Sequence, residues 1–554
     1  MDPTAVAPFF GTNTPPWLNE VRAEKPPRIE AAIRARFPEW TNAAAAWADE
    51  MLSTLSIAGS LELGRATVRE VPLDGARALF LFTNSTLTVP ELRVTRPEGG
   101  IVAELQLDHR SGDFLARVND CRIDPRAVRP LLDKDGREGL DEFVFKELPS
   151  LRAEVRGNLQ KLEHIGVTAQ VSASNVTYRG QSVRWVESGL TYTNEFLSFI
   201  QPRVLRDAGE HAEGDGVGID LRRHRLYLTN ATGRVTPMDL ARVINDDVER
   251  VLAPFRFDHP PEARAHGVIC LRKREHNNDV TFEVNGGTFH WLQFNLESAR
   301  GTVHWLGDAV LITNLVGRWK GGDTTGWAAL NFPPGAPDTM AFFMKLEGAD
   351  LHQVMLDLQP GKTNRLEGGW SGELTITHAQ LDDWKSWQGF GHSSLTNGLI
   401  WDIPLFGVAS QFLNAIPTPG MKLGNSRAKE AHMDFLITNS VIISENLEIR
   451  TGITRLRYEG SVDFEHRVDG RMEAELLRNI PGVGWLVSKV LFPVSKLFEY
   501  RITGTLDDPK TRPTYVLPSI ILMPLQPVKS LKEIFGEPEK KPADAREPKA
   551  DGDK

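Results

Sequence analysis

The stretch from Val280 to Leu315 reads VTFEVNGGTFHWLQFNLESARGTVHWLGDAVLITNL, and its spelling predicts the fold. Val280, Phe282 and Val284 alternate with polar residues, and the same alternation returns at Phe289–Trp291 and at Val303–Trp305. Successive side chains of a strand point to opposite faces of a sheet. The stretch therefore predicts strands with one apolar face and one polar face.

Turn residues divide this stretch. Gly286-Gly287, Ser298–Gly301 and Gly307-Asp308 are the predicted turns, which gives a meander of three or four short strands. Similar alternation covers most of the chain from Ser60 to Leu346. A meander by itself predicts no catalytic chemistry.

A few helices interrupt the strands. The alanine-rich stretch Arg28–Leu55 predicts a helix with a break at Pro38. Short helices are predicted at Asp124–Asp133, at Thr236–Leu252 with Thr236 as the N-cap, and at Asp350–Leu358.

An internal repeat of about 112 residues organises these elements. Gly75, Gly189 and Gly301 are each expected just before a strand pair, and they lie 114 (189 − 75) and 112 (301 − 189) residues apart. The short helices begin at Asp124, Thr236 and Asp350, which repeats the intervals 112 and 114. Because one such unit cannot cover its apolar face, the units are expected to stack into one continuous sheet.

Composition limits the functional classes. The chain has 554 residues, of which 41% are apolar and 25% charged, as in folded soluble proteins. A net charge of −9 argues against nucleic-acid binding, which needs a concentrated basic surface. Two cysteines, Cys121 and Cys270, provide neither a disulfide framework nor a zinc cluster. No cofactor or metal ligand set is predicted.

Membrane and targeting signals are not predicted. The N-terminal twenty or so residues contain no apolar core segment, and the sequence has no run of about 18 uncharged apolar residues. Neither a signal peptide nor a transmembrane helix is therefore expected.

The C-terminal region carries a family-like order of motifs. LITNSVIISENLEIRTG at Leu436–Gly452 and YEGSVDFEHRVDGRMEAEL at Tyr458–Leu476 are followed by a predicted amphipathic helix at Gly482–Phe498, and then by ITGTLDDPKTRP at Ile502–Pro513. This order resembles the C-terminal region of AsmA-like proteins, the bacterial envelope family that includes the TamB-type proteins. The resemblance covers roughly Gly389–Pro518.

The resemblance implies a fold and a function. The implied fold is an elongated, twisted antiparallel sheet curled into a half-pipe with an apolar concave surface. The implied function is non-enzymatic phospholipid movement or outer-membrane homeostasis in the periplasm, with phospholipid acyl chains and inner- or outer-membrane proteins as partners. The family has no catalytic residues to transfer. Its members usually begin with an inner-membrane helix, whereas none is expected from this sequence.

Residues of the repeated strands are the candidates for lining such a groove, and an ordinary packed core is the alternative for the same residues. The candidates are Val176, Tyr178, Val183, Trp185, Tyr192, Phe282, Val284, Phe289, Trp291, Val303 and Trp305.

Two other functional classes are open at this stage. One is an enzyme that acts on polysaccharide with two carboxylates about 5–9 Å apart, for which Glu187 and Asp308 serve as an illustration. The other is a purely structural scaffold with a filled core. Glu210–Asp215 is interpreted as a solvated loop and Arg222–Arg225 as a solvent-facing hairpin end.

The predicted organisation has five parts. They are an N-terminal helical segment at 1–55, repeated β units at 56–388, the AsmA-like region at 389–518, an apolar segment at 519–536 and a disordered tail at 537–554.

Overall fold

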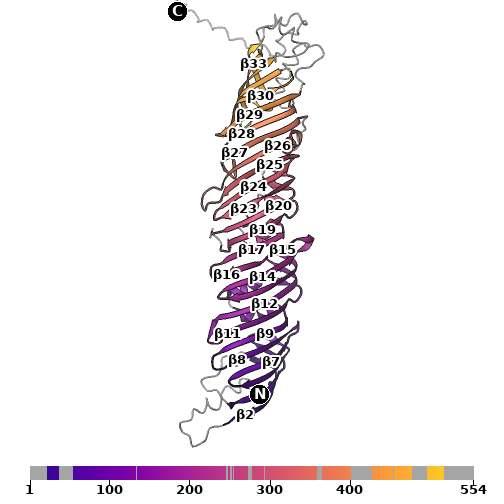
Figure 1. Cartoon of the computed structure of the whole chain (residues 1–554), viewed down its shortest axis with the longest axis vertical. Coiled ribbons are helices and arrows are strands. Elements are labelled where there is room, and N and C mark those ends of the chain that lie inside the picture. Colours follow the sequence, from indigo (N-terminus) through magenta and orange to yellow (C-terminus); the bar gives the residue numbers. More distant parts are fainter. Residues whose placement is uncertain are drawn as a thin grey trace, which may run out of the picture. The chain divides into compact units, whose positions relative to one another are not determined.

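The protein is described by a computed structural model (Figure 1). It describes residues 21–36, 54–132, 134–244, 248–249, 252–253, 255–272, 277–291, 294–358, 365–400, 427–452, 454–476 and 496–516. Within these residues, 28 strands belong to one antiparallel sheet. The prediction of a mainly β, repetitive antiparallel sheet is confirmed.

The chain divides into two compact units. Unit 1 comprises Met1–Leu292 with Ser298–Ile312, and unit 2 comprises Gln293–Glu297 with Thr313–Lys554. Strand β24 (Ala309–Trp319) contains the boundary at Ile312. Each unit is described separately below.

Most strands of unit 1 pair with the next strand along the chain. Other pairs in the main sheet skip one or more strands, namely β3–β6, β9–β11, β10–β12, β14–β16, β15–β17, β17–β19 and β20–β23. β1 pairs with β4 and β4 with β5, and β18 pairs with β21, in two small separate sheets. The strands are β1 (Val21–Ala23), β2 (Arg28–Arg34), β3 (Ser56–Leu63), β4 (Ala66–Val68), β5 (Val71–Leu73), β6 (Gly75–Thr83), β7 (Thr86–Thr95), β8 (Gly100–Asp108), β9 (Asp113–Arg122), β10 (Phe143–Phe145), β11 (Ser150–Asn158), β12 (Lys161–Tyr178), β13 (Gln181–Thr193), β14 (Phe196–Leu205), β15 (His211–Glu213), β16 (Gly216–Asp220), β17 (Arg225–Arg234), β18 (Phe255–Phe257), β19 (Glu262–Cys270), β20 (Asp279–Gly286), β21 (Phe289–Trp291) and β23 (Ser298–Leu306).

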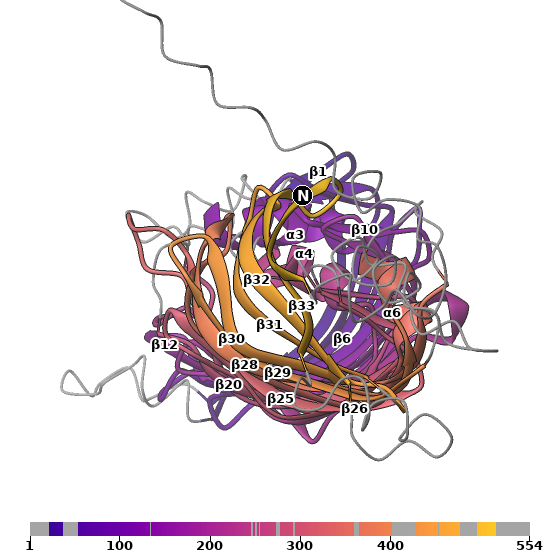
Figure 2. The ribbon, with the colours of Figure 1, turned by 90° about the horizontal axis from the view of Figure 1, so that it is seen from above.

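Among the described residues of unit 1, short helices connect strands. They are the 3-10 helices η4 (Pro125–Leu131) and η5 (Asp207–Gly209) and the α-helices α3 (Lys134–Asp141) and α4 (Pro237–Ile244). Figure 2 shows the strands of unit 1 curving around α3 and α4. This curvature is consistent with the predicted half-pipe, which stays a prediction.

Unit 2 has a closed hydrophobic core. Helix α6, strands β28 to β33 and the adjoining residues Leu366 and Ile400 bury fifteen side chains in one cluster, among them Leu351, Met472 and Tyr500. The elements of the unit are β22 (Phe294–Leu296), β25 (Gly322–Asn331), β26 (Thr339–Asp350), α6 (Leu351–Leu358), β27 (Glu367–Gln380), β28 (Asp383–Leu399), β29 (Ala428–Thr438), β30 (Val441–Arg450), β31 (Thr454–Asp463), β32 (Arg467–Leu476), β33 (Lys496–Thr505) and β34 (Pro509–Val516).

The repeat appears as one succession of elements. Strands β9, β17 and β26 begin at 113, 225 and 339, which are 112 (225 − 113) and 114 (339 − 225) residues apart. Each of them leads into a helix, η4, α4 or α6. The glycine markers are less regular, because Gly75 begins β6 but Gly189 and Gly301 lie inside β13 and β23. The expectation that these two glycines precede a strand pair is wrong.

The predicted N-terminal helix is wrong where it can be compared. Arg28–Arg34 forms β2, which pairs antiparallel with β3. Ile29, Ala31 and Ile33 alternate with period two, and pairing with β3 outweighs the helix preference of the alanine-rich composition. Residues 37–53, 401–426, 477–495 and 517–554 lie outside the described part of the chain. They include the rest of this segment, most of the predicted amphipathic helix and the predicted C-terminal segments.

The predicted meander around Val280 needs two corrections. β20 pairs with β23, whereas the intervening β21 leaves the main sheet and pairs with β18. Ser298–Gly301 is not a turn but the beginning of β23. The ring of Phe257 on β18 lies against Gly286, where a side chain would clash with it. The excursion is therefore anchored by aromatic packing on the main sheet.

Left-handed residues occur at bulges inside long strands. Gln201, Asn230 and Asn397 have φ values of 47°, 46° and 52°, and each lies where the pairing register shifts by an extra residue. A bulge lets a strand insert one residue and still return its side chains to the same face. Asparagine tolerates this backbone conformation better than most residues.

Because Gln201 has a left-handed backbone conformation that glycine adopts more easily, replacing it by glycine should stabilise the protein. Gln201→Gly should raise the urea midpoint and add about 0.5–1 kcal/mol, because relief of the left-handed conformation exceeds the entropy cost of glycine. The control is Gln170→Gly, at an exposed position of β12 with ordinary strand geometry, which should lower stability by about 0.5–1 kcal/mol. Changes of the same sign at both positions would contradict this account of the bulge.

Candidate functional site: the apolar face of unit 1

Cross-strand register produces an unbroken apolar row across unit 1. Residues that pair directly across an antiparallel ladder lie on the same face of the sheet. Following these pairs from β2 to β23 gives fifteen successive positions, each apolar or glycine, on fifteen strands. They are Ile29, Leu61, Ala78, Leu92, Ala103, Val118, Ala153, Ala169, Leu190, Phe199, Val217, Leu228, Gly267, Val280 and Trp305.

Neighbouring rows on the same face are also apolar. One row runs through ten strands as Val89, Leu105, Ala116, Val155, Val167, Tyr192, Leu197, Ile219, Leu226 and Ile269. Another runs as Ala173, Val186, Val204, Ala212, Gly233, Ala263, Val284 and Gly301. A shorter row contains Ala231, Ala265, Phe282 and Val303. We call these four rows together the apolar face.

The opposite face of the same strands is mostly polar. The row displaced by one residue runs as Glu104, Arg117, Glu154, Thr168, Thr191, Ser198, Gly218 and Tyr227. Arg117 donates from Nε to Glu154 Oε2 at 2.9 Å on this face. The two faces therefore differ in chemistry as the alternation predicts.

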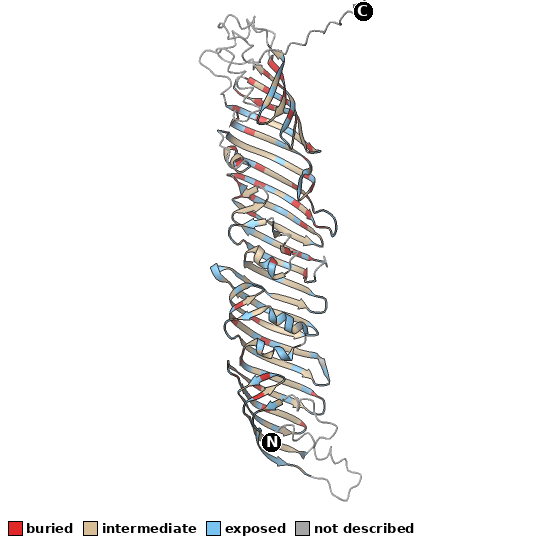
Figure 3. Ribbon diagram, turned by 180° about the vertical axis from the view of Figure 1, so that it is seen from behind, coloured by how far each residue is buried: buried red, intermediate tan, exposed pale blue. Residues whose placement is uncertain are grey.

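The apolar face is only partly covered by the protein. In the long row, Ala103, Ala169 and Val280 are buried, Ile29 is 61% exposed, and the other positions are half-buried. In unit 2, the cross-strand row formed by Ala328, Phe342, Ile376, Gly389 and Ile437 is buried, with Phe342 2% and Ile376 0% exposed. Nine of the ten largest fully buried side chains of the described residues belong to unit 2. Figure 3 shows this contrast along the strands.

Five of the predicted groove residues lie on the apolar face. They are Tyr192, Phe282, Val284, Val303 and Trp305, and all five are half-buried. Sequence reasoning did not select Leu190, Phe199 or Leu228, which occupy the same face. Their signal was the ordinary alternation of β13, β14 and β17, interrupted by the bulges at Gln201 and Asn230.

The other predicted residues have different surroundings. Val176 is 5% exposed and pairs with Val183 and with Phe145 of β10, while Tyr178 packs on Phe143 with ring centroids 4.5 Å apart. Trp185, in the first half of β13, pairs with Ser174 of β12 and with Leu205, the last residue of β14. Phe289 and Trp291 lie on β21, where both rings stack with Phe255 at 6.3 and 6.1 Å.

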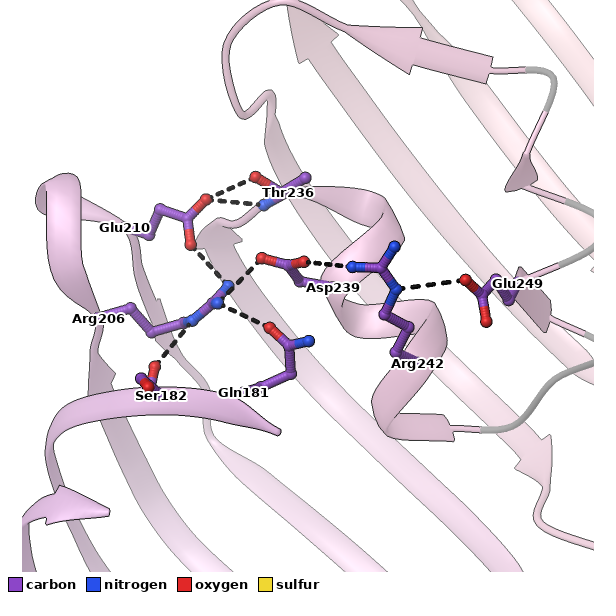
Figure 4. A network of polar contacts seen from close by, with 8 residues as sticks. All are labelled: Gln181, Ser182, Arg206, Glu210, Thr236, Asp239, Arg242 and Glu249. Carbon is purple, nitrogen blue, oxygen red and sulfur yellow. Dashed lines mark hydrogen bonds and ion pairs between the residues drawn. The ribbon is translucent and has the colours of Figure 1, made fainter. Parts of the chain in front are cut away.

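Helix α4 is held beside these strands by a half-buried ionic network (Figure 4). Arg206 donates to Glu210 at 2.6 Å, to Asp239 at 2.9 Å, to Gln181 at 3.0 Å and to the Ser182 carbonyl at 3.2 Å. The side chains of Arg206, Glu210 and Asp239 are 15%, 12% and 24% exposed. The interpretation of Glu210–Asp215 as a solvated loop is therefore wrong, because Glu210 joins this network and His211–Glu213 forms β15.

Both ends of α4 are fixed by side chains of neighbouring segments. Glu210 accepts hydrogen bonds from the Thr236 amide at 3.2 Å and from its hydroxyl at 2.6 Å, just before the helix begins. At the other end, Arg179 donates to the carbonyls of Val243 at 2.8 Å and Ile244 at 3.1 Å. A cation at the C-terminus also suits the helix dipole. The hydrogen bond from Arg179 lowers the pKa of Glu142, with which it forms a bidentate pair.

The carboxylate pair named for the polysaccharide enzyme lies far apart in the structure. Glu187 on β13 and Asp308 after β23 are six strands apart, roughly 29 Å along the sheet at ~4.8 Å per strand. Among the described residues no cluster of histidine, cysteine and carboxylate side chains has metal-binding geometry. Arg222 and Arg223 lie exposed between β16 and β17, as the predicted hairpin end.

Comparison with models of known protein families gives no match for this chain, and comparison with curated proteins gives no similar sequence. No helix in the described part of the chain has the length and apolar character needed to cross a bilayer.

The ionic network around Arg206 should stabilise helix α4, which hydrogen exchange can measure. Arg206→Ala leaves half-buried Glu210 without its cation and leaves Asp239 with Arg242 alone, 3.6 Å away, and breaking buried ion pairs costs up to about 3–5 kcal/mol. We expect amide hydrogen exchange in α4 to accelerate by about 100-fold. Arg222→Ala removes an exposed pair with Glu195, 3.0 Å long with side chains 72% and 52% exposed, and should change exchange in its own hairpin about twofold at most. Equal effects of the two changes would contradict the assigned role.

Proposed function

We propose that this chain is a non-enzymatic protein of the bacterial envelope that holds phospholipid acyl chains on the apolar face of unit 1. The observation that carries the proposal is the unbroken apolar row, most of whose side chains keep part of their surface exposed. Exposed apolar surface costs about 25 cal/mol per Å² relative to burial. A hydrocarbon ligand would recover this free energy.

The dimensions of the row suit hydrocarbon chains. Fifteen strands at ~4.8 Å spacing extend about 65 Å along the sheet. One leaflet of a bilayer core is about 15 Å thick, so the row has room for several acyl chains. Each methylene that leaves water for the apolar face contributes about 0.8 kcal/mol.

The resemblance to AsmA-like proteins supplies the ligand class and the location. It rests on Leu436–Gly452, Tyr458–Leu476 and the G-T-L-x-D-P motif at Gly504–Pro509, which lies at the β33–β34 turn. From it we propose a role in phospholipid transport or outer-membrane homeostasis in the periplasm, with inner- or outer-membrane proteins as partners. A filled-core scaffold role suits unit 2, whose apolar side chains are buried.

Site-specific photo-crosslinking tests the proposal. A photoreactive phenylalanine replaces either Phe199, on the apolar face, or Tyr227, a half-buried aromatic residue on the opposite face. After irradiation with phosphatidylethanolamine and phosphatidylglycerol vesicles, labelled lipid should attach at Phe199 and stay at background at Tyr227. Circular dichroism verifies that both variants fold.

Two results would count against the carrier function. One is the absence of lipid at Phe199 in a folded protein, which would show that acyl chains do not reach the apolar face. The other is equal labelling at Phe199 and Tyr227, which would indicate nonspecific adsorption rather than binding to one face.

A further inference from the structure

Strand β2 is an open edge of the main sheet. Among the described strands it pairs only with β3, so the hydrogen-bonding groups along its other side have no strand partner. All seven residues of β2 are exposed. Ile33 and Ile29, at 65% and 61%, are the most exposed large hydrophobic residues of the described chain. The long apolar row thus begins on a strand that leaves its side chains uncovered.

The edge strand β34 shows how this chain protects an edge. Its sequence, PKTRPTYV, places two prolines and two cations within five residues, Pro509 to Pro513. Proline cannot donate a ladder hydrogen bond, and exposed cations discourage strand addition. β2, with the sequence RIEAAIR, has no proline, its two cations Arg28 and Arg34 stand only at its ends, and its interior carries apolar residues at alternate positions. Without proline, and with cations only at its two ends, β2 is an edge that can accept a strand between Ile29 and Ile33.

We infer that β2 is the acceptor for an antiparallel strand of a different protein, which extends the main sheet by β-augmentation. Main-chain hydrogen bonds supply affinity in this mode, and alternate side chains supply specificity. The incoming strand carries apolar residues opposite Ile29, Ala31 and Ile33, so that it continues the apolar face. This inference does not depend on the proposed lipid function.

Charge defines the rest of the incoming strand. Arg28 and Arg34 are exposed at the two ends of β2, so acidic residues are favoured opposite them. Arg28 forms an ion pair with Glu30, but both side chains are well exposed, at 72% and 64%, and such pairs are weak. A second copy of this chain fits poorly, because antiparallel β2–β2 pairing centred on Ala31 places Arg28 opposite Arg34 twice.

A synthetic peptide tests the inference with the full-length protein. The peptide Glu-Val-Thr-Val-Lys-Val-Glu places acidic residues opposite both arginines, lysine opposite Glu30 and valine opposite the apolar positions. We expect saturable binding by fluorescence anisotropy. The charge-reversed peptide Lys-Val-Thr-Val-Glu-Val-Lys has the same alternation and should bind at least about tenfold more weakly.

Two further measurements distinguish strand pairing from adsorption. Methylation of the peptide backbone nitrogens at positions 2, 4 and 6, or alternatively at 3 and 5, blocks opposite edges of the peptide strand. Only one of these patterns should abolish binding. Ile33→Lys should weaken binding at least about tenfold, whereas Ile200→Lys, at a 47% exposed position of β14, should not.

Three outcomes would overturn the inference. The first is no binding of the acidic-ended peptide to the folded protein. The second is binding that both methylation patterns and Ile33→Lys leave unchanged. The third is a dimer in analytical ultracentrifugation that Ile33→Lys dissociates, which would make a second copy the occupant of β2.

Discussion

The cross-strand register of unit 1 is the constraint on which its apolar face depends. A slip of one residue between two strands would transfer every apolar side chain of one strand to the polar face. The pairing from β2 to β23 avoids this, since every position from Ile29 to Trp305 along the long row is apolar or glycine. The bulges at Gln201 and Asn230 help to keep this register. Each adds a residue to one strand and returns the following side chains to the face they had left.

Much of the fold was predictable because strand alternation is local. The β-rich class and the helices α4 and α6 follow from local residue patterns, and the repeat of 112 to 114 residues follows from their spacing. The bulges were not predictable in this way. A left-handed asparagine forms a hairpin turn at Asn194 and a strand bulge at Asn230, and both follow a threonine in the sequence. Which of the two forms depends on the pairing partner, which lies far away in the chain.

The candidate site was predicted in part for a related reason. Phe282, Val284, Val303 and Trp305 have the same alternation as Phe289 and Trp291, yet only the first four belong to the apolar face. β21 leaves the sheet because Phe255 and Phe257 offer it aromatic partners that are distant in sequence. Similarly, the partners of Arg206 come from three segments, so no local pattern identifies half-buried Glu210 as the side chain that binds the start of α4.

Both units have strands that alternate apolar and polar residues, but their apolar rows differ in burial. In unit 2 the apolar rows are packed by large rings such as Phe342 and Trp319 and become a core, whereas in unit 1 they remain half-buried.

The most direct test of lipid binding on the apolar face is the amount of phospholipid retained by full-length protein purified from bacterial cells, quantified by native mass spectrometry and lipid extraction. The account predicts at least about one bound phospholipid per chain, lost when Phe199 and Leu190 on the apolar face are both changed to aspartate. A folded, monodisperse protein that carries no lipid and takes none up from vesicles would contradict it.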